Sequence, residues 1–212
     1  MKARLLSPMT REDGYYAESI AIFSARRCRT TKDYKLLWEE VDGYDNNKRE
    51  QFLTNVIFQD WAADVLEMIH LVYDIEGIPV WLLIELLRHR LVAREFSIEQ
   101  LSQRAINSER LEIDVPEELR SITENYLDQV NGISKALKLP PEILRAAYPQ
   151  GVLVNLCIAG NLRAFQHFFF MRCSEALGGK GGAHPKFQEL ADQMLIQARE
   201  VLPLTLKVIM KA

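Results

Sequence analysis

Two parts of the chain each place a strand-like run directly before an apolar helix, and this arrangement limits the folds that the sequence can adopt. Apolar residues alternate with others within residues 67–77, which predicts a strand that Gly77 ends. Because proline is favoured in the first turn of a helix, a helix is expected to begin at Pro79 and to run on through Glu95. Residues 151–160 predict a buried strand, which leads directly into a helix over residues 161–173.

The rest of the chain has mainly helical apolar spacing. Helices are expected over residues 18–28, 48–66, 115–139, 141–148 and 185–210, and the glycine-rich residues 177–182 predict a loop. No repeat, low-complexity tract or linker divides the sequence, so a single domain over residues 1–212 is predicted. The fold class that follows is α+β, with helix dominating.

Composition argues against several classes of protein. The 212 residues carry a formal net charge of −3, whereas a protein that holds duplex DNA through many phosphates usually has a basic surplus. We therefore expect no nucleic-acid partner. The three cysteines and four histidines lack metal-ligand spacing, so we expect reduced thiols and no metal site. The N-terminus lacks the apolar core of a signal peptide, and no run of 18 apolar residues occurs, which predicts a cytoplasmic protein without a membrane span.

Positive charge is nevertheless concentrated in one short segment, residues 86–105. Its basic residues are Arg88, His89, Arg90, Arg94 and Arg104. Arg90 and Arg94 are one helical turn apart, and like charges at this spacing are mildly destabilising unless an anion lies between them. The segment therefore indicates a local pocket for one or two phosphates. The alternative is a solvated helix face on which the arginines pair with nearby glutamates.

A second basic helix is expected over residues 161–173. Arg163 and His167 are four residues apart, Arg172 lies five residues further on, and phenylalanines fill most of the positions between them. Burying arginine or histidine without a partner is costly, so a partner is implied for each. That partner is a carboxylate in one interpretation and a phosphate or an anionic ring in the other.

In combination, these motifs resemble the flavin-dependent thymidylate synthases. The family signature, R-H-R followed by S-x-R, is matched by residues 88–90 and by residues 102–104. Three further blocks resemble the family in the same order along the chain. They are "ARRC" at residues 25–28, "LRAAYP" at 144–149 and "NLRAFQHFFFMR" at 161–172, and residues 75–90 match the strand, turn and helix that lead into R-H-R.

The sequence also departs from the family pattern. The spacer between the two halves of the signature is longer by about one helical turn and carries "VARE" at residues 92–95. Glu85 stands where the family has a glutamine, Ala105 where it has a tyrosine, and Ala62 where it has a histidine. The loop over residues 177–182 is an insertion. These changes concern the substrate loop more than the scaffold.

The resemblance implies an α+β homotetramer with a central antiparallel sheet and active sites shared between chains. It implies FAD as cofactor and a pyrimidine nucleotide as substrate, with methylenetetrahydrofolate and NADPH as co-substrates. The reaction would be reductive methylation at ring carbon 5, taking dUMP to dTMP. Two alternatives remain open: a relative that methylates another pyrimidine nucleotide such as UMP, and a flavin- or nucleotide-binding relative without turnover, which Glu85 and Ala62 favour.

The resemblance also assigns roles to residues. Arg172 would polarise the pyrimidine carbonyl and Ser102 would touch the base or sugar, so these two are the predicted catalytic residues. The predicted substrate-binding set is Glu85, Arg90, Arg94, Gln100, Ser102, Gln103, Arg104, Arg145 and Arg172. The predicted cofactor-binding set is Arg88, His89, Arg90, Asn161, Arg163 and His167.

The extra arginine of the longer spacer has a hypothesis of its own. If the helix continues for another turn, Arg94 lies above Arg90 at the mouth of the nucleotide pocket. There it would contact the phosphate or a sugar hydroxyl and help to set which nucleotide is accepted. The alternative is an arginine at the surface of a longer turn.

Overall fold

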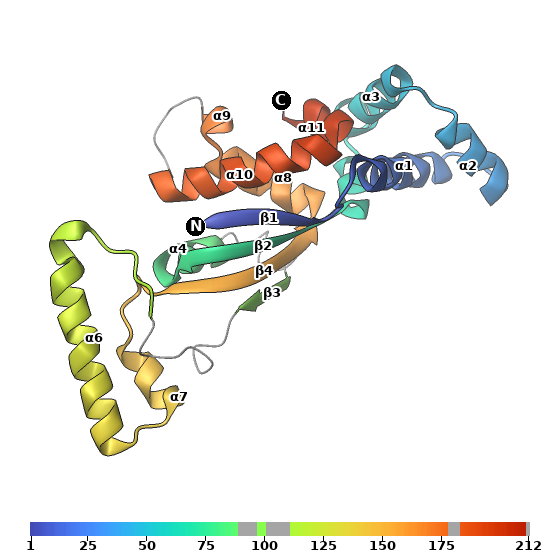
Figure 1. The fold of residues 1–212 in the computed structure, drawn as a ribbon. Coiled ribbons are helices and arrows are strands. Elements are labelled where there is room, and N and C mark those ends of the chain that lie inside the picture. Colours follow the sequence, from blue (N-terminus) through green and yellow to red (C-terminus); the bar gives the residue numbers. More distant parts are fainter. Residues whose placement is uncertain (89–96, 101–110, 178–182, 211–212) are drawn as a thin grey trace.

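The computed structural model describes residues 1–88, 97–100, 111–177 and 183–210, and within these ranges it forms a four-stranded sheet with the order β1-β2-β4-β3 (Figure 1). The strands are β1 (Lys2–Ser7), β2 (His70–Pro79), β3 (Ser97–Gln100) and β4 (Leu153–Asn161). Every neighbouring pair is antiparallel. The predicted α+β class with an antiparallel sheet is confirmed.

The helices gather on one side and at both ends of this sheet. They are α1 (Arg11–Arg27), α2 (Tyr34–Asp42), α3 (Asn46–Thr54), the π-helix η1 (Asn55–Gln59), the 3₁₀-helix η2 (Ala63–Met68), α4 (Val80–Leu87), α6 (Glu117–Leu137), α7 (Pro141–Leu144), the 3₁₀-helix η4 (Arg145–Ala147), α8 (Leu162–Arg172), α9 (Ser174–Leu177), α10 (Pro185–Val201) and α11 (Pro203–Ile209). In Figure 1, α8 and α10 lie along the sheet, α1 to α3 are grouped at one end, and the hairpin of α6 and α7 projects at the other.

The central strands and α8 form the core that the apolar pattern predicts. Leu71, Tyr73 and Ile75 of β2 are fully buried. The Tyr73 ring lies 5.5 Å from the ring of Phe165 on α8, and its hydroxyl donates a 2.8 Å hydrogen bond to the Met194 carbonyl on α10. This packing fixes α8 against the sheet, so that its buried face is apolar and its polar residues face outward or toward the helix ends.

The prediction that Gly77 ends the strand is wrong. Gly77 adopts a φ of 68° inside β2, and the register with β4 shifts between Ile75 and Ile78. The glycine therefore makes a bulge, which its missing side chain permits, and the strand continues to Pro79. The helix that follows is α4, which begins at Val80 and ends at Leu87, and residues 89–95 of the helix predicted to run through Glu95 lie outside the described residues.

Two other predicted helices are interrupted. The helix expected over residues 48–66 consists of α3, the π-helix η1 and, after Trp61 with a φ of 55°, the 3₁₀-helix η2. The helix expected over residues 185–210 breaks at Leu202, because Pro203 has no N–H to continue it and begins α11 instead. The helices expected over residues 18–28, 115–139, 141–148 and 161–173 are confirmed, the third as α7 followed by η4.

The edge strand β1 is not predicted by the sequence pattern. Its free edge is covered by α10, from which Gln193 accepts a hydrogen bond from the Ala3 N–H at 3.0 Å and Gln197 accepts one from the Leu5 N–H at 2.8 Å. The Gln197 amide also donates to the Ala3 carbonyl at 3.0 Å. Side chains nearly 200 residues away in the sequence thus form hydrogen bonds with backbone groups at the outer edge of β1, which would otherwise be unpaired. Strand β3 was not predicted either.

Candidate functional site

Helix α8 carries four of the predicted site residues along its length. Asn161 is its N-cap, and the side-chain oxygen accepts a 2.9 Å hydrogen bond from the Ala164 N–H. At the same junction the Leu162 N–H donates to the Ile69 carbonyl at 2.7 Å, which ties the start of the helix to β2. Arg163 and His167 are both exposed and lie one turn apart on the same face.

Arg163 has a carboxylate partner within the chain. Its guanidinium forms a 2.6 Å ion pair with Glu67 of η2, and the two side chains are 50% and 41% exposed. Of the two interpretations of this arginine, the carboxylate partner is the one that the structure shows. A pair this exposed contributes little stability, and a guanidinium has five N–H donors, so Arg163 can still bind an anion.

Arg172 lies at the opposite end of α8, about 13 Å along the axis from Arg163. Its side chain is half-buried, and the guanidinium carbon lies 4.7 Å from the centre of the buried Phe187 ring in the first turn of α10. Stacking on an aromatic face restricts a guanidinium without using its N–H donors. Arg172 therefore lies at one end of α8, and Arg163 and His167 lie toward the other. The helix carries basic side chains in two separate regions.

Glu85 of α4 lines a pocket of about 550 Å³. The lining residues are Trp81, Glu85, Asp114, Val115, Pro116, His184 and Lys186. The Trp81 and His184 rings meet edge to face at 4.7 Å, and Lys186 forms an ion pair with Asp114. The first turn of α4 is anchored by the Trp81 N–H, which donates to the Gln150 carbonyl at 3.0 Å. Within the chain, Glu85 precedes Arg88 by about one helical turn. Arg88 is exposed and directly follows the last residue of α4.

Sequence reasoning missed most of this pocket. In the sequence Trp81 lies within an apolar helical segment, and His184 lacks metal-ligand spacing, so neither pattern indicates a pocket. Asp114 and Lys186 had no local signal, because they come from segments far apart in the sequence. Within the described residues, no cluster of histidine, cysteine and acidic side chains could hold a metal ion, and no helix is both long and apolar enough to cross a membrane.

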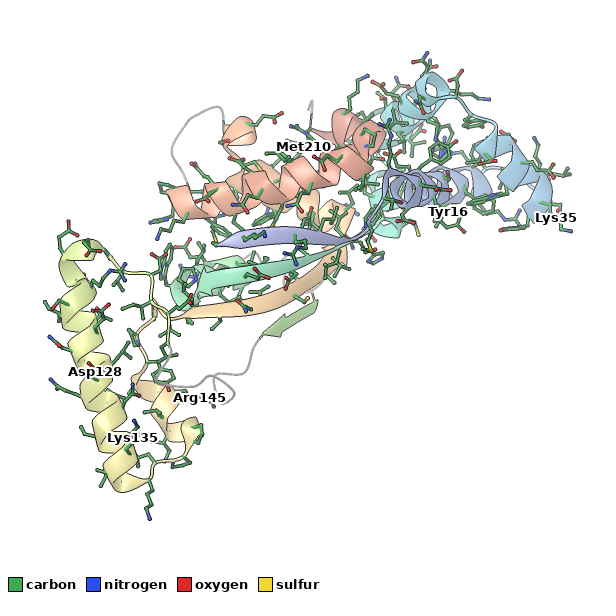
Figure 2. The ribbon with its side chains drawn as sticks, in the orientation of Figure 1. Tyr16, Lys35, Asp128, Lys135, Arg145 and Met210 are labelled. Atoms are coloured by element: carbon green, nitrogen blue, oxygen red, sulfur yellow. The ribbon has the colours of Figure 1, made fainter. Side chains whose placement is uncertain are left out.

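Arg145 is not brought together with α8. It is exposed in η4, on the projecting hairpin formed by α6 and α7, and Figure 2 shows it well away from the part of the molecule in which α8 lies in Figure 1. Gln100 is the last residue of β3 and is paired in register with Leu156 of β4. The other predicted site residues, His89, Arg90, Arg94, Ser102, Gln103 and Arg104, lie outside the described residues, as does the proposed stacking of Arg94 on Arg90.

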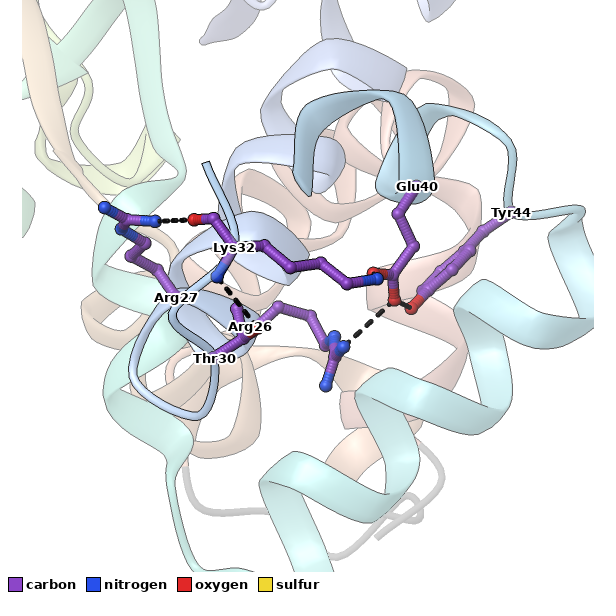
Figure 3. A network of polar contacts seen from close by, with 6 residues as sticks. All are labelled: Arg26, Arg27, Thr30, Lys32, Glu40 and Tyr44. Atoms are coloured by element: carbon purple, nitrogen blue, oxygen red, sulfur yellow. Dashed lines mark hydrogen bonds and ion pairs between the residues drawn. The ribbon is translucent and has the colours of Figure 1, made fainter. Parts of the chain in front are cut away.

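The arginines of the "ARRC" block hold together the corner between α1 and α2 (Figure 3). Arg26 forms a 3.0 Å ion pair with Glu40, which also accepts hydrogen bonds from Lys32 at 2.7 Å and from the Tyr44 hydroxyl at 2.6 Å. The hydrogen bonds from Lys32 and Tyr44 lower the pKa of Glu40 to about 2. The Arg27 guanidinium donates to the Lys32 carbonyl at 2.5 Å. These contacts give Arg26 and Arg27 structural partners.

Comparison with known proteins gives a consistent result. Residues 13–204 match the family model described as thymidylate synthase complementing protein. The flavin-dependent thymidylate synthase of Corynebacterium glutamicum is 30% identical in an alignment that covers 75% of this chain and 68% of that protein. The enzyme of Corynebacterium efficiens is 27% identical over 77% of this chain and 70% of its own length. The flavin-dependent thymidylate synthase of Mycobacterium tuberculosis is 29% identical over 66% of this chain and 61% of its own length.

Solved structures share the fold. Thymidylate synthase X of Helicobacter pylori, with FAD and dUMP, superposes with a TM-score of 0.68 over 97% of this chain and 99% of that one, at 17% identity. A UMP/dUMP methylase of Streptomyces cacaoi bound with 5-Br dUMP gives a TM-score of 0.70 over 99% and 94%, also at 17% identity. With the family model spanning all of the chain from α1 to α11, the protein belongs to the flavin-dependent thymidylate synthases, a family of enzymes.

Proposed function

We propose that the protein catalyses the FAD-dependent reductive methylation of a pyrimidine nucleotide at ring carbon 5. The observation that carries this proposal is α8, which presents Asn161, Arg163 and His167 toward its N-terminal half and Arg172 at its C-terminal end. The most direct form of the reaction, implied by the names of the relatives, takes dUMP to dTMP. UMP is a second candidate substrate, because one structural neighbour is a UMP/dUMP methylase.

The donor groups on α8 fit a flavin dinucleotide. Arg163 and His167 are exposed on one face, where a planar guanidinium and an imidazole suit a pyrophosphate or a flavin ring. The ion pair between Arg163 and Glu67 is exposed on both sides, so exchanging the carboxylate for a phosphate costs little. Arg88 at the end of α4 would join them. When bound and reduced, FAD would supply the hydride, and NADPH would restore the reduced form.

The chain's own residues would act on the nucleotide. Arg172 would donate hydrogen bonds to a ring carbonyl as negative charge develops there, which makes carbon 5 nucleophilic. Its half-buried position on the Phe187 ring holds the guanidinium in place before reaction. Arg145 and Arg104 would hold the nucleotide phosphate, and Ser102 would contact the base or sugar. In the overall reaction the C5 hydrogen leaves as a proton, and the methylene carbon of the folate becomes the new methyl group with two electrons and one hydrogen from the reduced cofactor.

The direct test is the release of tritium from nucleotides labelled at carbon 5. With FAD, NADPH and methylenetetrahydrofolate present, we expect the protein to release tritium from at least one of dUMP, UMP and dCMP, and to do so only when all three co-reactants are supplied. We also expect the purified protein to be yellow. A colourless protein that releases no tritium from any of them would contradict the proposal and favour the non-catalytic alternative.

We further propose that the active protein is a homotetramer whose sites combine residues of different chains. Arg145 is held away from α8 within one chain, so a nucleotide that needs both Arg145 and Arg172 must take them from two chains. In addition, α6 exposes an apolar stripe at helical spacing, which a single chain leaves uncovered. Its residues are Leu119, Ile122, Tyr126, Ile133 and Leu137.

Mixing two inactive variants tests this sharing of sites. Arg145→Ala and Arg172→Ala should each be inactive alone, whereas co-expressed chains that assemble at random should regain about one quarter of the wild-type rate, since each restored site takes one intact arginine from each chain. Light scattering should give the mass of four chains. A monomer that retains flavin, or mixed chains without recovered activity, would contradict shared sites.

A further inference from the structure

The pocket beside α4 has a hydrogen-bonding pattern that distinguishes between pyrimidine bases. Its volume of about 550 Å³ is within the range of small-molecule sites. One wall is formed by the Trp81 and His184 rings, which meet at 4.7 Å and offer an aromatic surface to a flat ligand. Two of its lining residues are close in sequence to residues predicted to bind ligands: Glu85 precedes Arg88 by three residues, and Lys186 precedes Phe187, on which Arg172 stacks.

The charges that line this pocket are not equivalent. Lys186 and Asp114 form an ion pair with each other, so their charges are largely cancelled. Glu85 is half-buried in the wall, and its carboxylate forms no hydrogen bond or ion pair with any residue that the structure describes. An ionised carboxylate has two acceptor oxygens, and those of Glu85 face a pocket rather than a described donor. The pocket therefore presents an acceptor that a ligand can satisfy.

His184 lines the same pocket and can supply a donor. Its Nδ1 accepts the Lys186 N–H at 3.3 Å as the N-cap of α10. In the neutral imidazole the proton is then on Nε2, which can donate to a ligand. The pocket thus combines an aromatic wall, an acceptor that cannot donate when ionised, and a ring N–H donor.

We propose that Glu85 makes the enzyme select cytosine nucleotides, with the carboxylate accepting a hydrogen bond from the exocyclic amine. This inference rests on the proposed function and names its substrate class. Cytosine offers the amine N4–H₂ next to the acceptors N3 and O2, which matches a pocket that holds both a carboxylate acceptor and the His184 N–H donor. The only donor on the corresponding edge of uracil is N3–H, which lies between two carbonyl oxygens that repel a carboxylate.

The same contact supports the reaction at carbon 5. A carboxylate that accepts a hydrogen bond from the amine increases electron density in the ring, and carbon 5 is the atom next to the amine-bearing carbon. The product would be the 5-methylcytosine nucleotide. The C5 hydrogen would leave as a proton, and a bond would form from carbon 5 to the methylene carbon as its bonds to the two folate nitrogens break and tetrahydrofolate leaves. Reduced FAD would supply the two electrons and the remaining hydrogen of the methyl group.

Binding measurements test this preference without requiring turnover. We expect calorimetric titration of the purified protein to show dCMP bound about tenfold or more tightly than dUMP, and CMP similarly preferred to UMP. Glu85→Gln, which keeps the shape and adds an amide donor, should bring the dCMP/dUMP ratio near one or reverse it. Glu200→Gln makes the same chemical change at an exposed position near the far end of α10 and should leave the ratio unchanged.

Tritium release separates this inference from the function on which it rests. If the wild-type protein releases tritium from dCMP faster than from dUMP, the result supports both the proposed methylation and the role of Glu85. If it releases tritium from dUMP or UMP but prefers them to the cytosine nucleotides, methylation stands and the role of Glu85 is wrong. If no nucleotide releases tritium, the proposed function is wrong. The ratio of the dCMP and dUMP affinities then tests by itself whether Glu85 selects cytosine. An unchanged ratio in Glu85→Gln would overturn the inference.

Discussion

Arg172→Ala is expected to abolish methylation while the flavin spectrum stays nearly unchanged. Loss of one fixed donor at a developing negative charge lowers kcat by about 100- to 1000-fold. Flavin binding should be retained, because Arg172 lies at the opposite end of α8 from Arg163 and His167. The measurements are the rate of tritium release and the absorbance of bound flavin in the purified variant.

His167→Ala should show the reverse order of effects. Its exposed ring lies one turn from Arg163, so its loss should weaken FAD binding first and lower activity only through incomplete loading. Arg120→Ala removes a surface arginine of α6 whose partner is Glu117, and it should leave both properties unchanged. Turnover of Arg172→Ala at nearly the wild-type rate would show that the assignment of roles along α8 is wrong.

Gly14→Ala is expected to destabilise the fold strongly. A Cβ atom at Gly14 of α1 would lie 1.9 Å from the Val201 carbonyl oxygen and 2.7 Å from its carbon, at the end of α10. These are backbone atoms and cannot move aside like a flexible side chain, so the two helices must separate. We expect a loss of about 3 kcal/mol, at the upper end for overpacking, and a Tm about 10 °C lower.

Gly132→Ala is the matched control for this substitution. It places the same methyl group in the middle of α6, where no atom lies within 4 Å of the new Cβ. Because alanine favours a helix over glycine by about 1 kcal/mol, this variant should be slightly more stable than the wild type. If thermal denaturation gives Gly14→Ala the wild-type Tm, α1 and α10 cross less closely than the structure shows.

The elements predicted correctly are those whose pattern is complete within one segment. Residues 161–173 combine an N-cap asparagine with an apolar face of phenylalanines, and both features act over one or two turns. The alternation in β2 and the apolar run of β4 are equally local. The same holds for the site: the spacing of Arg163, His167 and Arg172 on one helix follows from the sequence alone.

The misassigned elements depend on contacts with distant residues. A glycine with positive φ can end a strand or form a bulge within it, and the pairing of Ile78 with Val154 beyond Gly77 decides for the bulge. Strand β1 has little pattern of its own and is held by β2 and by two glutamines of α10. The break at Leu202 is different, because Pro203 lacks an N–H and marks the end of the helix within the sequence itself.

The sequence by itself determined the fold class, the two strand-to-helix junctions and the spacing of the basic groups on α8, because hydrophobic periodicity and helix capping are properties of short segments. Only the tertiary structure brought Trp81, Asp114 and His184 to one pocket and left the half-buried Glu85 carboxylate without a partner among the residues that the structure describes. It also held Arg145 away from α8. The packing of helices and strands decides which side chains from distant segments meet. A pattern within one short segment does not contain that information.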